Sequence, residues 1–143
     1  MIIFLRRHSR KAKYYMKKNN LAKLWLQKGR EDLIYAQAVV NEVEIYGLLC
    51  FHCQQAVEKY LKGYLTQIGI KFRKTHKLPE LLLLCIGNDH SFSKFKGEVL
   101  FLDKYYIEAR YPVDSPQDHS KTEAKNAIKM AKQIINFVDK KFS

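Results

Sequence analysis

Residues 45–69, IYGLLCFHCQQAVEKYLKGYLTQIG, contain the clearest helical pattern in the chain. Steps of three and four residues, the spacing of one helix face, separate Cys50, Cys53, Val57, Leu61, Tyr64 and Ile68. Gly69 follows, and glycine readily adopts the left-handed geometry that ends helices. The pattern therefore predicts a helix over residues 45–68.

The same spacing recurs on both sides of this segment. An upstream helix over residues 21–41 is predicted, with Trp25 beside a stripe made of Ala22, Leu26, Gly29, Leu33, Ala36 and Val40. Downstream, residues 78–86 are short and almost wholly apolar, and Pro79 is tolerated because the first helical turn needs no donor there. These residues predict a short helix.

A third long helix is predicted from Phe95, Val99, Leu102, Tyr106 and Ala109. We expect Ser91 or Ser93 to cap its start, and Pro112 to end it by disfavouring helical geometry at the preceding residue.

The last helix is predicted to begin at Ser115, with Pro116 in its first position and Asp118 in its first turn. It runs to about residue 141 on a stripe formed by Ala124, Ala127, Ala131, Ile134 and Val138. Four long amphipathic helices with short connections predict an all-α protein. We expect an antiparallel up-and-down four-helix bundle with an additional short helix.

Charge divides the chain into two parts. Among 26 Lys and Arg residues and 14 Asp and Glu residues, seven basic residues and no acid lie in residues 1–20. We therefore expect a basic N-terminal arm over residues 1–20 and a mildly basic bundle over residues 21–143. Such an arm either binds nucleic acid or is simply a solvated terminus.

Several classes of function find no support in the sequence. It has no phosphate-binding glycine loop, dinucleotide fingerprint or zinc-protease motif, and no apolar run approaches the ~20 residues that cross a bilayer. Cys50 and Cys53 resemble half a metal site, but they lie on the apolar stripe, so core packing is the favoured interpretation. We expect a cytoplasmic protein with no metal, cofactor or membrane partner.

Basic and imidazole groups are the candidate site residues. His52, Gln55, Lys59 and Lys62 form a polar line that could hold phosphate; the alternative is a solvated face with a Glu58–Lys62 ion pair. A loop adds further cations and one imidazole, namely Lys71, Arg73, Lys74, His76 and Lys77.

Arg110 and His119 flank the break before the last helix. An arginine and a histidine, either His119 or His76, could cleave RNA without a metal, by stabilising the phosphate charge and moving the proton of the ribose hydroxyl. The alternative is that a loop histidine only caps or hydrogen-bonds its surroundings.

Residues 51–65, FHCQQAVEKYLKGYL, resemble the signature helix of the HEPN family, the higher eukaryote and prokaryote nucleotide-binding domains. Residues 74–78 (KTHKL), residues 105–112 (YYIEARYP) and Ala36 in the first helix agree with the same pattern. The resemblance spans residues 21–138 and omits the arm.

This resemblance implies a homodimeric bundle that binds nucleotide or RNA, often beside a small nucleotidyltransferase in a toxin–antitoxin-like pair. The motif matches that the resemblance implies for binding are His52, Gln55, Lys59, Lys62, His76 and Arg110. With Arg73 and Lys74 of the basic loop, these are the predicted binding residues. Some family members are metal-independent ribonucleases in which four to six residues separate an arginine from a histidine. Here eight residues separate Arg110 from His119, so the family's catalytic spacing is not matched. A purely structural dimer is the third alternative.

Overall fold

The computed structural model describes residues 2–108, 111–112 and 118–142, and within these ranges it is helical without any β-strand. The elements are α1 (Ile2–Val39), α2 (Tyr46–Ile68), α3 (Leu78–Asn88), the 3-10 helix η1 (His90–Phe95), α4 (Lys96–Asp103), α5 (Tyr105–Glu108) and α6 (Lys121–Lys141). The predicted all-α class is confirmed.

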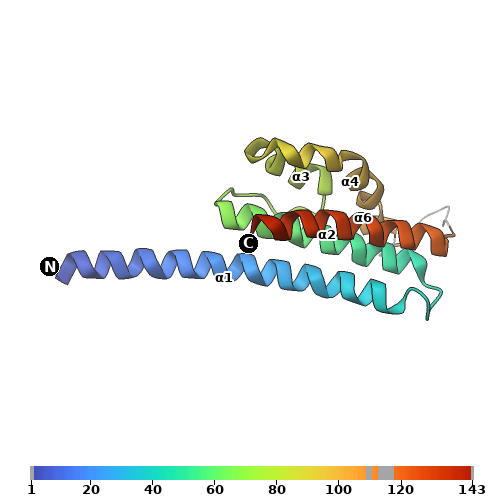
Figure 1. Cartoon of the computed structure of the whole chain (residues 1–143), viewed down its shortest axis with the longest axis horizontal. Helices are drawn as coiled ribbons and strands as arrows, with labels where there is room; N and C mark the ends of the chain where they lie inside the picture. Colours follow the sequence, from blue (N-terminus) through green and yellow to red (C-terminus); the bar gives the residue numbers. More distant parts are fainter. Residues whose placement is uncertain (1, 109–110, 113–117, 143) are drawn as a thin grey trace.

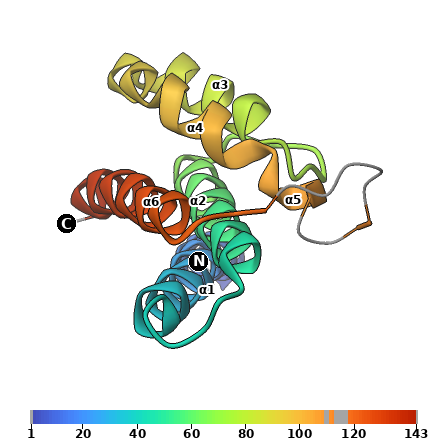
Figure 2. The same ribbon diagram turned by 90° about the vertical axis from the view of Figure 1, so that its right-hand side faces the viewer.

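The helices form two layers (Figures 1 and 2). In one layer α1 packs against α2 and α6, which both run opposite to it. In the other, α3 to α5 lie over α2 and α6. The long segments α1, α2, η1 to α5, and α6 therefore alternate in direction, as an up-and-down bundle requires.

Helix α2 is the centre of the core. Most of its residues from Leu49 to Leu65 are buried, including three polar ones, Gln54, Glu58 and Lys62. The predicted stripe of the upstream helix and the predicted stripe of α6 are both buried, and Cys50 and Cys53 are fully enclosed. Core packing of the two thiols is thus confirmed, and burial raises the pKa of the Cys50 thiol to about 12.

Two glycines allow α1 and α2 to approach closely. A Cβ atom at Gly29 would lie 2.7 Å from Cδ2 of Tyr60 and 2.9 Å from the carbonyl oxygen of Ala56. One at Gly63 would lie 2.8 Å from Cδ2 of Leu26. All three distances are shorter than a real Cβ atom shows, so neither position can carry a side chain without displacing its neighbours.

The helix boundaries differ from the predictions in three places. Helix α1 begins at Ile2, so the residues expected to form an arm continue the helix. The predicted third long helix is divided into η1, α4 and α5, and its cap is not Ser91 or Ser93: the carboxylate of Asp89 accepts from the backbone of Ser91. Helix α6 begins at Lys121, where Ser120 accepts from the backbone of Glu123. The predicted start at Ser115 and Pro116 lies outside the described residues.

Candidate functional site

A buried ion pair in α2 is the foundation of the site. Nζ of Lys62 lies 3.1 Å from Oε2 of Glu58, and both side chains are more than nine-tenths buried. The predicted pair therefore forms, but in the interior rather than on a solvated face. The ammonium group also lies over the rings of Trp25 and Phe72, at 5.4 and 5.9 Å from their centroids. Burial of two charges is costly unless further polar groups surround them.

Those further groups come from the same helix and from the loop after it. Nε2 of Gln54 donates to Oε1 of Glu58 over 3.4 Å and to the carbonyl oxygen of His76 over 3.0 Å. Gln55 donates to Glu58 over 3.4 Å and to Gln54 over 2.8 Å. Helix α2 ends at Ile68, and the loop that follows runs back along the helix. The hydrogen bond from Gln54 to the carbonyl oxygen of His76 holds this loop against α2.

His76 is the point at which three sequence motifs meet. Its Nδ1 lies 3.0 and 3.2 Å from the two carboxylate oxygens of Glu58. Its ring stacks on Tyr106 of α5, with centroids 4.2 Å apart and an interplanar angle of 13°. The side chain is nonetheless 48% exposed. The carboxylate of Glu58 thus engages Nδ1 of a ring that is still half exposed.

The basic residues of the loop surround this histidine unequally. Arg73 binds Glu80 through two contacts of 2.5 and 2.7 Å, and this guanidinium holds the pKa of the Glu80 carboxyl below its usual value. Lys71, Lys74 and Lys77 are exposed. The lysines, rather than Arg73, can therefore turn toward an incoming anion.

A second cluster contains His52 and Lys59, the other two residues of the predicted polar line. Asp32 of α1 accepts from Lys59 over 2.6 Å and contacts Nδ1 of His52 at 2.9 Å. Burial opposes ionisation of Asp32, but the hydrogen bonds to His52 and Lys59 outweigh it and lower its pKa. His52 also packs edge-on against Tyr35. His52 and Lys59 thus connect α1 to α2, while Gln55 and Lys62 belong to the cluster around Glu58.

His119 packs edge-on against Tyr105 of α5. Its Nδ1 bonds to Glu123, its Nε2 lies 3.7 Å from Glu108, and its side chain is 13% exposed. The ring packs so closely on Gly47 that a Cβ there would lie 2.6 Å from Cδ2 of His119. His119 and His76 contact neighbouring tyrosines, Tyr105 and Tyr106, but have different carboxylate partners. Arg110, the third candidate for catalysis, lies outside the described residues.

Glu58, Asp32 and Tyr106 are the residues that sequence reasoning did not place in the site. Glu58 was detectable as the only acid in residues 51–65 of the signature helix. No signal in the sequence indicated that Asp32 would take up His52 and Lys59, because its partners lie on another helix.

No group of three or more His, Cys, Asp or Glu side chains in the described part of the chain is arranged to hold a metal ion. Among the helices described here, none is both long and apolar enough to cross a membrane.

The comparison with protein families identifies the fold. The model of the HEPN domain matches residues 22–141. The chain belongs to the HEPN domain family. Two crystal structures are similar to this HEPN protein: TT1696 from Thermus thermophilus, at 32% identity and a TM-score of 0.76, and ST0689, an archaeal HEPN homologue, at 27% identity and a TM-score of 0.69. Each comparison covers 85% of this chain and 98% of the other. No curated protein matches the chain at a significant level.

Proposed function

We propose that this HEPN protein binds nucleotide or RNA at His76. One observation carries the proposal: the buried Glu58 orients an exposed imidazole that is stacked on Tyr106. The signature helix, the loop and α5 each supply one of these three residues. Packing alone does not explain this arrangement, because an apolar side chain in place of Glu58 would fill the same space without a buried charge.

The chemistry of the site suits both parts of a nucleotide. The exposed Lys74 and Lys77, which flank His76 in the loop, offer donors to phosphate oxygens. The outer face of the His76–Tyr106 stack offers a platform for a base, and stacking of this kind contributes about 1–3 kcal/mol per base.

Cleavage of RNA receives no comparable support. The ribonuclease alternative pairs Arg110 with His119 or His76. Arg110 lies outside the described residues, and the two ring nitrogens of His119 both face carboxylates. Binding is therefore the function that the geometry favours.

We also propose that the protein forms a homodimer and associates with a small nucleotidyltransferase, as family membership suggests. An apolar hollow of about 320 Å³ between α3 and α4, beside Leu83 and Leu100, supports a protein–protein contact. These two leucines are 69% and 66% exposed. Sedimentation velocity of the wild type and of Leu83→Glu tests the homodimer, and co-purification with the co-expressed enzyme tests the second partner. A cytoplasmic location stays a prediction from the sequence.

The binding proposal is tested by replacing His76 and measuring affinity for ATP by calorimetry and for a labelled single-stranded RNA by fluorescence polarisation. We expect His76→Ala to weaken both by at least about tenfold, or about 1.4 kcal/mol. His90→Ala is the matched control, because His90 is an exposed histidine at the start of η1. Wild-type affinity in His76→Ala would contradict the proposal. Intact RNA after incubation in EDTA would argue against the ribonuclease alternative.

A further inference from the structure

The basic residues at the start of the chain form part of a helix, not a loose arm. Seven Lys and Arg residues and no acid occur in residues 1–20, all before the HEPN match begins at residue 22. Helix α1 nevertheless begins at Ile2. Residues 2–20, which form the first half of α1, span about 28 Å at about 1.5 Å per residue. Figure 1 shows this part of α1 projecting beyond the end of α2, with no other element beside it.

The charges in this segment have helical spacing. Steps of four, three and four residues separate Arg6, Arg10, Lys13 and Lys17, and Arg10 and Lys17 are exposed. Like charges at these spacings destabilise a helix. A polyanion along the segment would remove that repulsion, so we expect binding to increase its helicity.

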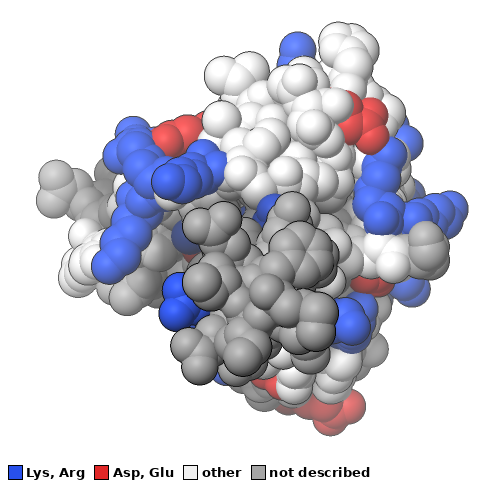
Figure 3. Space-filling model, turned by 90° about the vertical axis from the view of Figure 1, so that its left-hand side faces the viewer, with Lys and Arg blue, Asp and Glu red and all other residues white. Residues whose placement is uncertain are grey.

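The segment is continuous with the candidate site. Lys18 and Lys71 line one hollow of about 360 Å³, together with Gly69 and Phe72. Lys71 opens the loop that ends at His76. Figure 3 looks onto the end of the molecule from which α1 projects, and Lys and Arg side chains gather on both sides of that end. Lys18 of the projecting helix therefore lies beside Lys71, the first lysine of the loop that carries His76.

The length of this segment and its position beside the loop of His76 indicate its ligand. A free nucleotide is far shorter than 28 Å, whereas a nucleic-acid strand carries a phosphate at every nucleotide and so presents several along that length. A lipid headgroup has no base to place on the His76–Tyr106 stack. A nucleic-acid strand can use both features.

We propose that residues 2–20 of α1 bind the phosphate backbone of a single-stranded RNA whose bases reach His76, so that the ligand is a polynucleotide rather than a free nucleotide. The part of this inference that concerns His76 rests on the proposed function. The backbone contact itself is independent of it.

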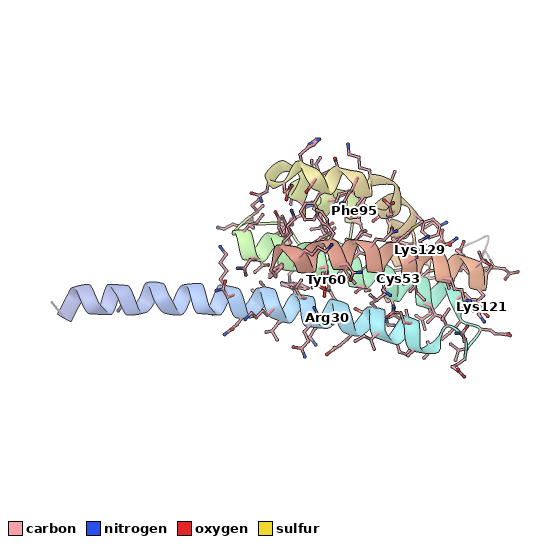
Figure 4. All side chains as sticks on the ribbon, viewed as in Figure 1. Arg30, Cys53, Tyr60, Phe95, Lys121 and Lys129 are labelled. Atoms are coloured by element: carbon pink, nitrogen blue, oxygen red, sulfur yellow. The ribbon has the colours of Figure 1, made fainter. Side chains whose placement is uncertain are left out.

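The test compares two full-length variants of equal charge. One is Arg6→Gln/Arg10→Gln/Lys13→Gln/Lys17→Gln, and the control is Lys121→Gln/Lys125→Gln/Lys129→Gln/Lys132→Gln, which removes four exposed cations from α6. Figure 4 labels Lys121 and Lys129, and Lys121 lies at the end of the bundle away from the projecting helix. The affinity for a 24-nucleotide single-stranded RNA is measured by fluorescence polarisation between about 50 and 250 mM salt, and helicity by circular dichroism.

The slope of log affinity against log salt reports the number of phosphate contacts. At about 0.7 per contact for single strands, loss of four contacts reduces the slope by about 2.8. We expect this reduction in the α1 variant only, together with loss of the RNA-induced gain in helicity. Equal slopes for the α1 variant and the wild type would overturn the inference, as would an equal reduction in the α6 control.

Two further measurements separate the possible failures. Flotation with phosphatidylserine vesicles tests a membrane surface instead: vesicle binding that is lost in the α1 variant while the RNA slope is unchanged would overturn the inference. ATP binding separates the two proposals. If His76→Ala abolishes it and the α1 variant keeps the wild-type slope, the inference fails and the proposed function stands. If the α1 variant loses slope and His76→Ala binds normally, the backbone contact stands and the function proposed for His76 fails.

Discussion

The ion pair between Glu58 and Lys62 allows the stability of the protein to be separated from the geometry of its site. Both groups are more than nine-tenths buried, and no solvent can replace a lost partner. Removal of one member of a buried pair typically costs about 3–5 kcal/mol, because the other charge is left unpaired. We therefore expect Glu58→Leu and Lys62→Met each to lower the free energy of unfolding by about that amount. For a chain of this size the melting temperature falls by roughly 6–20 °C.

The double variant Glu58→Leu/Lys62→Met should behave differently. Replacement of a whole buried pair by apolar residues of similar volume is often neutral or stabilising. We therefore expect the free energy of unfolding of the double variant to lie within about 2 kcal/mol of the wild-type value. His76, however, loses the acceptor for its Nδ1. Affinity for RNA should then fall as it does in His76→Ala, although the fold is intact.

Urea unfolding of the four proteins supplies the double-mutant cycle, and fluorescence polarisation supplies the affinities. If either single variant lowered the free energy of unfolding by less than about 1 kcal/mol, Glu58 and Lys62 would not depend on each other as buried charge partners. Wild-type RNA affinity in the stable double variant would show that Glu58 does not orient His76 for binding.

Two further predictions concern stability. Gly29→Ala should destabilise the protein by about 1–3 kcal/mol, because its Cβ would lie 2.7 Å from Tyr60; Gly97→Ala, with nothing within 4 Å, is the control and should be neutral or stabilising when both are unfolded in urea. The pKa of Asp32 is lowered by His52 and Lys59, and that of Asp89 is lowered to about 2, chiefly by Lys141. Because both carboxyls have a depressed pKa in the folded state, the stability that they contribute is present above about pH 4 and is lost as pH falls toward 2. Unfolding measured across this window should show a shallower decline in Asp32→Asn, and an unchanged decline would contradict the assignment.

The helices could be predicted because their signal is local. The stripe from Ala22 to Val40 and the stripe from Ala124 to Val138 each repeat at helical spacing, and both are buried. The caps were harder to predict because neighbouring polar residues compete for the same role. Asp89 takes the position expected for Ser91 or Ser93, since a carboxylate accepts the backbone donor and also binds Lys141.

The candidate site could be predicted only in outline. Spacing places His52, Gln55, Lys59 and Lys62 on one line of α2, but spacing does not indicate which acids face that line. Asp32 engages the first and third of these residues, and Glu58 the second and fourth. Their cations are therefore neutralised within the protein. Of the predicted binding residues that the structure describes, His76 and Lys74 are exposed and keep no lysine or arginine partner on the polar line, so the binding proposal rests on His76 and the exposed lysines beside it.

This neutralisation explains why a central helix carries polar residues in the core. If stability alone were required, apolar side chains at Gln54, Glu58 and Lys62 would serve as well, because the net contribution of a buried ion pair is small or unfavourable. The loop that doubles back over α2 has few apolar anchors, with only Ile70 and Phe72 packed against the core. It is also held by the hydrogen bond from Gln54 to the carbonyl of His76, by the contact of His76 with Glu58, and at its end by the bond from the backbone of Leu78 to Asp103. The polar groups within α2 therefore help to fix where the loop lies, and the contact with Glu58 fixes the position of Nδ1 of His76.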